Sequence, residues 1–264
     1  VMRMKENNPD RVIYLADARQ SMHFIQVFRC ARKTGIVPDT TELVHIGFGT
    51  MNGKDGKPFK TRDGGVMRLE YLLKEIDDEM LNKIKENQKE KENLNIDEAE
   101  AEQTAKTVAL AAVKYGDLSN QASKDYIFDI DRFTSFEGNT GPYILYTIVR
   151  IKSILSKYEA KGGNISALKD AIMPAVNAGQ KNLMLSLAKF NATIESAYEE
   201  SAPHKICAYI YELANAFNGF YHDTKILSEE NEELKKSYIS LLVLTKEILE
   251  ACIDMLGFSA PDRM

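Results

Sequence analysis

RVIYLADARQSMHFIQVFRCARKTGIVPDTTELVHIGFGT, residues 11–50, contains two short apolar runs separated by a helical pattern. The runs at 11–17 and 42–50 are rich in β-branched and aromatic residues and typical of strands. Between them, apolar residues recur at helical spacing before a glycine: Met22, Ile25, Val27, Phe28, Ala31 and then Gly35. Two strands about thirty residues apart with a helix between them predict a βαβ unit with a parallel pair.

The segment GKDGKPFKTRDGG, residues 53–65, follows the second strand directly and is dense in glycine and in Lys or Arg. Ligands of open α/β sheets bind beyond the carboxyl ends of the strands, where this loop and ADARQ, residues 16–20, are expected to lie. The loop lacks the glycine spacing and the Ser/Thr of a P-loop, and no dinucleotide-binding G-x-G-x-x-G occurs. Two interpretations remain open: a loop that closes over a triphosphate, or a solvated turn.

Composition indicates a globular protein of 264 residues with two domains and no membrane span. The formal net charge of −5 disfavours a uniformly basic nucleic-acid binder, although residues 1–70 carry 12 Lys/Arg against 8 Asp/Glu. The cysteines, Cys30, Cys207 and Cys252, show no metal-ligand or disulfide spacing, so we expect reduced thiols and no protein-bound metal. The start, VMRMKENNPD, has neither an apolar run nor a cleavage site of a signal peptide, so we expect a cytoplasmic location.

The remainder of the chain reads as helical. Residues 67–120 are heavily charged and predict a solvated helix pair or one long exposed helix. After SFEGNTGPY, residues 135–143, helical patterns cover 140–160, 165–176, 179–199, 203–222 and 230–256. The last pattern predicts a core-facing stripe, made of Leu241, Leu244, Ile248, Ala251 and Met255.

Several motifs, in this order, resemble arginyl-tRNA synthetases, a family of class I aminoacyl-tRNA synthetases. KPFKT at 57–61 resembles the KMSKS signature of that class, and FEGNTGPY at 136–143, ELANAFNGFYHD at 212–223 and APDRM at 260–264 resemble further family segments. The likeness spans essentially the whole chain. It implies an enzyme that activates arginine with ATP and transfers it to tRNA.

One departure concerns the HIGH motif, which holds ATP in the first half of the family's nucleotide-binding fold and has no counterpart in this sequence. The resemblance therefore implies a C-terminal piece, not competent alone. We expect a mainly α protein: a remnant of a parallel α/β nucleotide-binding fold at 1–66, a helical connecting region at 67–136 and an all-α anticodon-binding bundle of the DALR type at 137–264. The alternative is a tRNA-binding module without catalysis.

The resemblance also implies roles for residues near the two strands. Lys57 and Lys60 would hold the ATP phosphates and stabilise the transition state, with Mg²⁺ only as the counter-ion of ATP. Gln20 and His23 would contact the arginine substrate, since an amide oxygen suits a guanidinium that offers only donors. The adenine would lie against a third group: His45, Gly47, Phe48 and Gly49.

For the bundle, Tyr143, Tyr146 and Arg150 fall on one face of a predicted helix, a pattern able to combine base stacking with a phosphate contact. Tyrosines at this spacing also pack cores, and both interpretations stay open. Four further residues match family positions near the anticodon: Asn218, Tyr221, His222 and Met264. The expected partners are arginine-accepting tRNA, arginine and ATP, with neither DNA nor a membrane.

Overall fold

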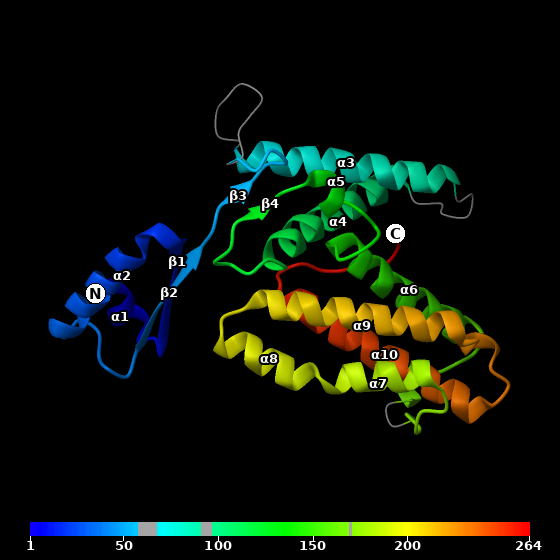
Figure 1. Cartoon of the computed structure of the whole chain (residues 1–264). Coiled ribbons are helices and arrows are strands. Elements are labelled where there is room, and N and C mark those ends of the chain that lie inside the picture. Colours follow the sequence, from blue (N-terminus) through cyan, green and yellow to red (C-terminus); the bar gives the residue numbers. More distant parts are fainter. Residues whose placement is uncertain (58–67, 91–96, 169–170) are drawn as a thin grey trace. The chain divides into compact units, whose positions relative to one another are not determined.

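The computed structural model describes residues 1–57, 68–90, 97–168 and 171–264. The chain forms two compact units, shown in Figure 1. Unit 1 comprises Val1–Val66 and Asn120–Phe128, and unit 2 comprises Met67–Ser119 and Asp129–Met264. We describe each unit by itself.

Unit 1 contains the predicted βαβ element. Strand β1 (Arg11–Asp17) leads through a 3₁₀ turn (Ala18–Gln20) into helix α2 (Ser21–Lys33), and β2 (Glu42–Phe48) follows. A short helix, α1 (Met2–Asn7), precedes them. The two strands pair in parallel over seven residues each, and α2 packs against β2 (Figure 1). The predicted parallel pair is therefore confirmed.

A second strand pair was not predicted. The two-residue strands β3 (Met51–Asn52) and β4 (Tyr126–Ile127) pair in parallel, and the Gly49 N–H donates to the Ala122 carbonyl at 2.9 Å. Strands this short carry no period-2 pattern, and their pairing joins segments about 75 residues apart. The sequence offered no local signal for them.

The apolar face of α2 is largely uncovered in this structure. Met22, Ile25 and Val27 are 64%, 43% and 43% exposed, and Leu15 on β1 is 67% exposed. Two strands cannot bury both of their faces and a full helix stripe as well. The helical spacing of these residues was predicted correctly. Helical spacing alone does not show that the side chains are buried.

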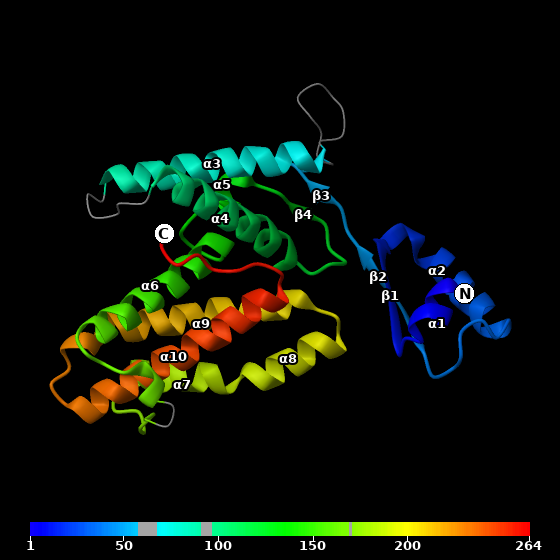
Figure 2. The same ribbon diagram turned by 180° about the vertical axis from the view of Figure 1, so that it is seen from behind.

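Among the described residues of unit 2, the regular secondary structure is entirely helical. Its helices are α3 (Leu69–Glu90), α4 (Glu98–Leu118), α5 (Ile130–Phe133), α6 (Gly141–Ala160), α7 (Ala178–Ala188), α8 (Phe190–Glu199), α9 (Pro203–Asp223) and α10 (Glu232–Met255). Helices α7 and α8 run along α9, as Figures 1 and 2 show. Helix α6 begins at an N-cap, Thr140, whose hydroxyl accepts from the Tyr143 N–H at 3.2 Å. The segment GNTGPY, residues 138–143, thus contains the start of α6, close to residue 140 where the helical pattern was predicted to begin.

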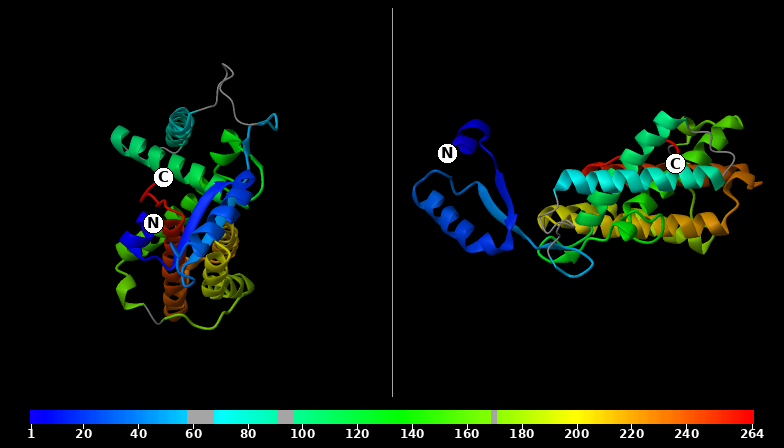
Figure 3. Two further views of the ribbon diagram at one scale, coloured as in Figure 1. Left: turned by 90° about the vertical axis from the view of Figure 1, so that its left-hand side faces the viewer. Right: turned by 90° about the horizontal axis from the view of Figure 1, so that it is seen from above.

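The charged region before the bundle is a helix pair with a substantial core. Helix α3, the cyan helix of Figure 3, packs across α4, and α4 in turn packs on α6. One face of α3 is buried at successive turns through Leu72, Ile76 and Met80, and α4 buries Ala105 and Val108. The prediction of a helix pair is confirmed, but α4 is largely buried because α3 and α6 cover it.

Three details of the helical prediction were wrong. Residues 165–176 were expected to be helical, but among the described residues of this range only Ile165–Ala167 form a helical turn, of the 3₁₀ type, and 171–177 are irregular. The pattern at 179–199 divides at Lys189 into α7 and α8. In α10, Ala251 and Met255 are exposed.

From Leu241 onward, the buried face of α10 is rotated from the predicted stripe and consists of Leu241, Leu242, Thr245, Leu249, Cys252 and Ile253. Helix α10 packs against both α6 and α9, so a broad face is covered rather than one seam. Spacing of three and four residues alone does not select among neighbouring faces.

No described helix combines the length and the apolar character that a membrane crossing needs. Within the same residues, no three His, Cys, Asp or Glu side chains cluster in a way that could hold a metal ion.

The three thiols differ sharply in environment, which gives a first prediction. Burial raises the pKa of Cys207 and of Cys252 to about 12, whereas Cys30 is exposed on α2. Because the thiolate is the reactive form, a thiol reagent at pH 8 should label one cysteine rapidly and the other two only after unfolding. Cys30→Ser should remove the rapid phase. Rapid labelling of two or three thiols would contradict this burial.

Candidate nucleic-acid interface

Arg150 on α6 is flanked by two aromatic rings and one amide. Its guanidinium carbon lies 4.7 Å from the centre of the Tyr146 ring and 5.4 Å from that of Tyr221. Its Nη1 donates to Oδ1 of Asn218 at 2.7 Å. Tyr146 precedes Arg150 by one turn, and Asn218 and Tyr221 share a face of α9. The contact between α6 and α9 therefore fixes a cation between π surfaces.

A hydrogen-bond network continues from this arginine. The Asn218 Nδ2 donates to the Tyr143 hydroxyl at 2.9 Å and to Thr147 Oγ1 at 3.3 Å. The Tyr143 hydroxyl in turn donates to Oδ1 of Asn215 at 2.7 Å. Both ends of the Asn218 amide are engaged inside the protein. The network therefore fixes the orientation of the Arg150 guanidinium.

Arg150 opens onto a cleft of about 1250 Å³ in unit 2. Helix α6 contributes Tyr146 and Arg150, α9 contributes Tyr221, and the segment after α10 contributes Arg263 and Met264. Three lysines also line the cleft: Lys152, Lys157 and Lys246. Cations beside aromatic rings in a concave surface provide what a single-stranded nucleic acid needs, namely stacking platforms and charge for the backbone.

The cleft brings together four of the seven residues predicted to contact tRNA: Tyr146, Arg150, Tyr221 and Met264. Tyr143 and Asn218 join the network instead, and His222 is exposed with its Nδ1 2.9 Å from Oδ1 of Asp223. The lysines were not predicted. Lys152 and Lys157 lie on the same helix as Arg150 and could have been noticed, whereas Lys246 reaches the cleft from α10.

In unit 1, the four residues predicted to contact adenine lie at the end of β2. The His45 ring stacks on Phe24 with centroids 4.4 Å apart, and its Nε2 is buried without a hydrogen-bond partner in the described part of the chain. Phe48 is 42% exposed, so it is not a core residue here. A buried, unpartnered ring nitrogen fits a polar ligand.

Gly47 and Gly49, at the end of β2, allow other backbone segments of the protein to pack closely against them. A Cβ at Gly47 would lie 2.9 Å from Cα of Ala18, and one at Gly49 would lie 2.5 Å from the Lys124 carbonyl group. Such distances exclude a side chain at either position. The space that a side chain would need at these glycines is occupied by neighbouring backbone. Their predicted contact with adenine stays a prediction.

The residues predicted to contact arginine follow β1 and are accessible. Gln20 is the N-cap residue of α2, and exposed His23 meets the Phe24 ring edge-on at 5.6 Å. Nearby, hydrogen bonds from the Arg19 side chain lower the pKa of Asp17 to about 2. The carboxyl end of β1 thus carries an ionised carboxylate that Arg19 already engages.

The glycine-rich loop is described only to Lys57, and Lys60 lies outside the described residues. The Gly53 N–H donates to the Lys57 carbonyl at 2.8 Å, and the Lys57 N–H to Oδ1 of Asp55 at 3.0 Å. Gly56 has φ +71°, a left-handed conformation that suits glycine. This part of the loop is a tight turn that presents Lys57 to solvent.

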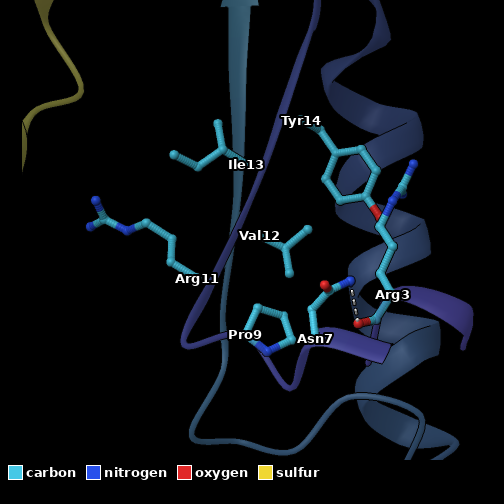
Figure 4. Close-up of a pocket in the computed structure, with 7 residues that line it drawn as sticks. All are labelled: Arg3, Asn7, Pro9, Arg11, Val12, Ile13 and Tyr14. Atoms are coloured by element: carbon cyan, nitrogen blue, oxygen red, sulfur yellow. Dashed lines mark hydrogen bonds between the residues drawn. The ribbon is translucent and has the colours of Figure 1, made fainter. Parts of the chain in front are cut away.

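Unit 1 has a cleft of its own, of about 360 Å³, which lies beside β1 (Figure 4). The Arg3 Nη1 donates to the Tyr14 hydroxyl at 3.0 Å on one side of it, and Arg11 and Ile13 lie on the other. None of the residues predicted to contact ATP or arginine is among its described lining residues. We assign it no role.

Comparison with known proteins divides the chain into two matched regions, with the boundary between residues 130 and 144. A family described as tRNA synthetases class I (R), catalytic domain, matches residues 1–130, and the DALR anticodon binding domain matches 144–264. An arginine–tRNA ligase of Alkaliphilus oremlandii is 54% identical over 262 residues, 99% of this chain. The chain belongs to the arginyl-tRNA synthetase family. The resemblance inferred from KPFKT and FEGNTGPY is thereby confirmed.

Other members of the family agree. An arginine–tRNA ligase of Francisella tularensis is 42% identical over 264 residues. The crystal structure of the arginyl-tRNA synthetase of Plasmodium falciparum matches 99% of this chain with a TM-score of 0.81 at 27% identity. The chain spans 43% of the length of each of these three relatives. Its predicted fold class, a mainly α protein with a parallel sheet remnant, is confirmed.

Proposed function

We propose that this chain takes part in the ATP-dependent attachment of arginine to its tRNA in the cytoplasm, and that the cleft beside Arg150 receives the anticodon. The observation that carries the proposal is the Arg150 guanidinium, held between Tyr146 and Tyr221 in a region that matches an anticodon-binding domain. Unstacked bases of a single-stranded loop pack on such aromatic and guanidinium surfaces.

In unit 1, the proposed role of these residues is to position ATP and arginine and to stabilise the charge of the ATP phosphates. Lys57 is exposed at the turn and, with Lys60, would neutralise the phosphates of ATP, which arrives with its Mg²⁺. The unpartnered Nε2 of His45 supports an adenine contact at the end of β2, alongside Phe48. The amide oxygen of Gln20 would accept hydrogen bonds from the substrate guanidinium.

Binding of arginine-accepting tRNA tests the anticodon assignment. The chain should bind this tRNA with an affinity that falls as salt rises from about 50 to 200 mM, because phosphate contacts release counterions. Changing the anticodon bases should weaken binding about tenfold or more at both salt concentrations, since stacking contributes about 1–3 kcal/mol per base. Equal affinity for the two tRNAs would overturn the proposal.

A further inference from the structure

The segment that follows α10 is fixed at its start by turn geometry and by burial. Gly257 has φ +80°, and the Phe258 N–H donates to the Ile253 carbonyl at 3.1 Å, which closes the helix in a Schellman-type turn. Phe258 is buried, and the Lys114 ammonium on α4 donates to the Gly257 carbonyl. The chain then runs from α10 toward α4 and α6, drawn in red in Figure 2. We call residues 257–264 the tail.

Lys152 on α6 engages the middle of the tail. Its Nζ lies 3.2 Å from the Pro261 carbonyl oxygen, 3.4 Å from that of Ala260 and 3.2 Å from Oδ1 of Asp262. The same ammonium lies 3.5 Å from Oε1 of Glu250 on α10. Its side chain is only 22% exposed. An ammonium has three donor hydrogens, so protein acceptors already occupy the donors of Lys152.

The far end of the tail enters the cleft. The Arg263 guanidinium lies 3.1 Å from Oε1 of Glu100 on α4, and Met264 lines the same cleft as Arg150. Lys152 is two residues after Arg150 on one helix. The ammonium therefore ties the backbone just before Arg263 to the helix that carries Arg150.

We propose that Lys152 is a positioning residue for anticodon recognition: by binding residues 260–262, it holds Arg263 and Met264 in place as part of the cleft that Arg150 shares. A lysine lining such a cleft would ordinarily be read as a phosphate ligand. The four protein acceptors around its ammonium point instead to an action through the tail. This inference rests on the function proposed above.

The test compares Lys152→Met with Lys157→Met. Lys157 is on the same helix and lines the same cleft, but it makes no hydrogen bond or ion pair with the tail among the described residues. Both variants lose one positive charge. For each, the Kd is measured with arginine-accepting tRNA and with the same tRNA carrying a changed anticodon.

We expect Lys152→Met to lose about tenfold of the preference for the correct anticodon, because the tail is no longer held. Lys157→Met should weaken binding of both tRNAs equally and keep the preference, as the loss of general phosphate attraction does. Lys152→Arg, which restores a cation with several donors, should recover most of the preference. Amide hydrogen exchange should become faster at 259–264 in Lys152→Met and stay unchanged in α9.

The outcomes separate the two proposals. If the unmodified chain shows no preference for the anticodon, the proposed function fails. If it shows a preference that Lys152→Met retains, or that Lys157→Met loses equally, the role of Lys152 is overturned. Should Lys152→Met not fold, Asp262→Asn removes one exposed partner of the ammonium. It should reduce the preference in the same direction by a smaller factor, and an unchanged preference would count against the proposal.

Discussion

Arg150→Lys should remove most of the preference for the correct anticodon while keeping the salt dependence of tRNA binding. Lysine preserves the charge but lacks the planar guanidinium that lies over Tyr146 and Tyr221 and bonds to Asn218. Loss of about 1.4–2.7 kcal/mol of stacking and hydrogen bonding corresponds to about 10- to 100-fold in Kd. The measurement is the Kd for the two tRNAs at two salt concentrations.

Arg150→Met extends this experiment. This variant removes the charge as well, so the slope of log affinity against log salt should also become shallower, by the amount expected for the loss of about one phosphate contact. Arg132→Lys, at an exposed arginine of α5, is the matched control and should change neither quantity. An unchanged slope in Arg150→Met, together with an unchanged preference in Arg150→Lys, would remove Arg150 from the binding surface.

Gly141→Ala should destabilise unit 2 strongly. A Cβ on this first residue of α6 would press on the Ala111 carbonyl oxygen of α4 and lie 2.6 Å from its carbon. Both contacts are with backbone, which cannot rotate away as a side chain does. Overpacking of this kind costs about 3 kcal/mol, which lowers the midpoint of thermal unfolding by roughly 10 °C.

Gly219→Ala provides the opposite expectation. Gly219 lies inside α9, and a Cβ there would meet nothing within 4 Å. Alanine is favoured over glycine by about 0.5–1 kcal/mol in a helix, so the midpoint should rise by a few degrees. If the two variants had equal midpoints, the close contact between α4 and α6 would be wrong. Gly141→Ala should also weaken tRNA binding, because α6 carries Tyr146 and Arg150.

Local chemistry determined several elements of the fold in advance. The β-branched runs at 11–17 and 42–48 and the helical pattern between them were sufficient for the parallel pair. The helix start at Thr140 and Pro142 follows from an N-cap hydroxyl and a proline at the first turn. These signals concern neighbours in the chain, so they survive without knowledge of the tertiary fold.

The sequence did not predict which side chains are buried, nor the pairing of the two shortest strands. Strand β4 has two residues and exists because β3 lies beside it, so no pattern announces it. The buried face of α10 depends on where α6 and α9 lie. The sequence pattern at 165–176 favours a helix, but tertiary contacts compete with it: the Ser240 hydroxyl of α10 donates to the Leu168 carbonyl at 2.7 Å.

At the candidate site, too, local spacing predicted some features and tertiary packing decided the others. Tyr143, Tyr146 and Arg150 could be placed on one helix face from their spacing alone, because the α-helical repeat sets it. The partners of Arg150, however, lie on α9, 68 residues away in the case of Asn218, and Lys152 reaches a carbonyl 109 residues further along the chain. Hydrogen bonds and cation–π contacts depend on distance through space. Sequence therefore supplied the residue types, and only the packing of α6 against α9, α10 and the tail made them one surface.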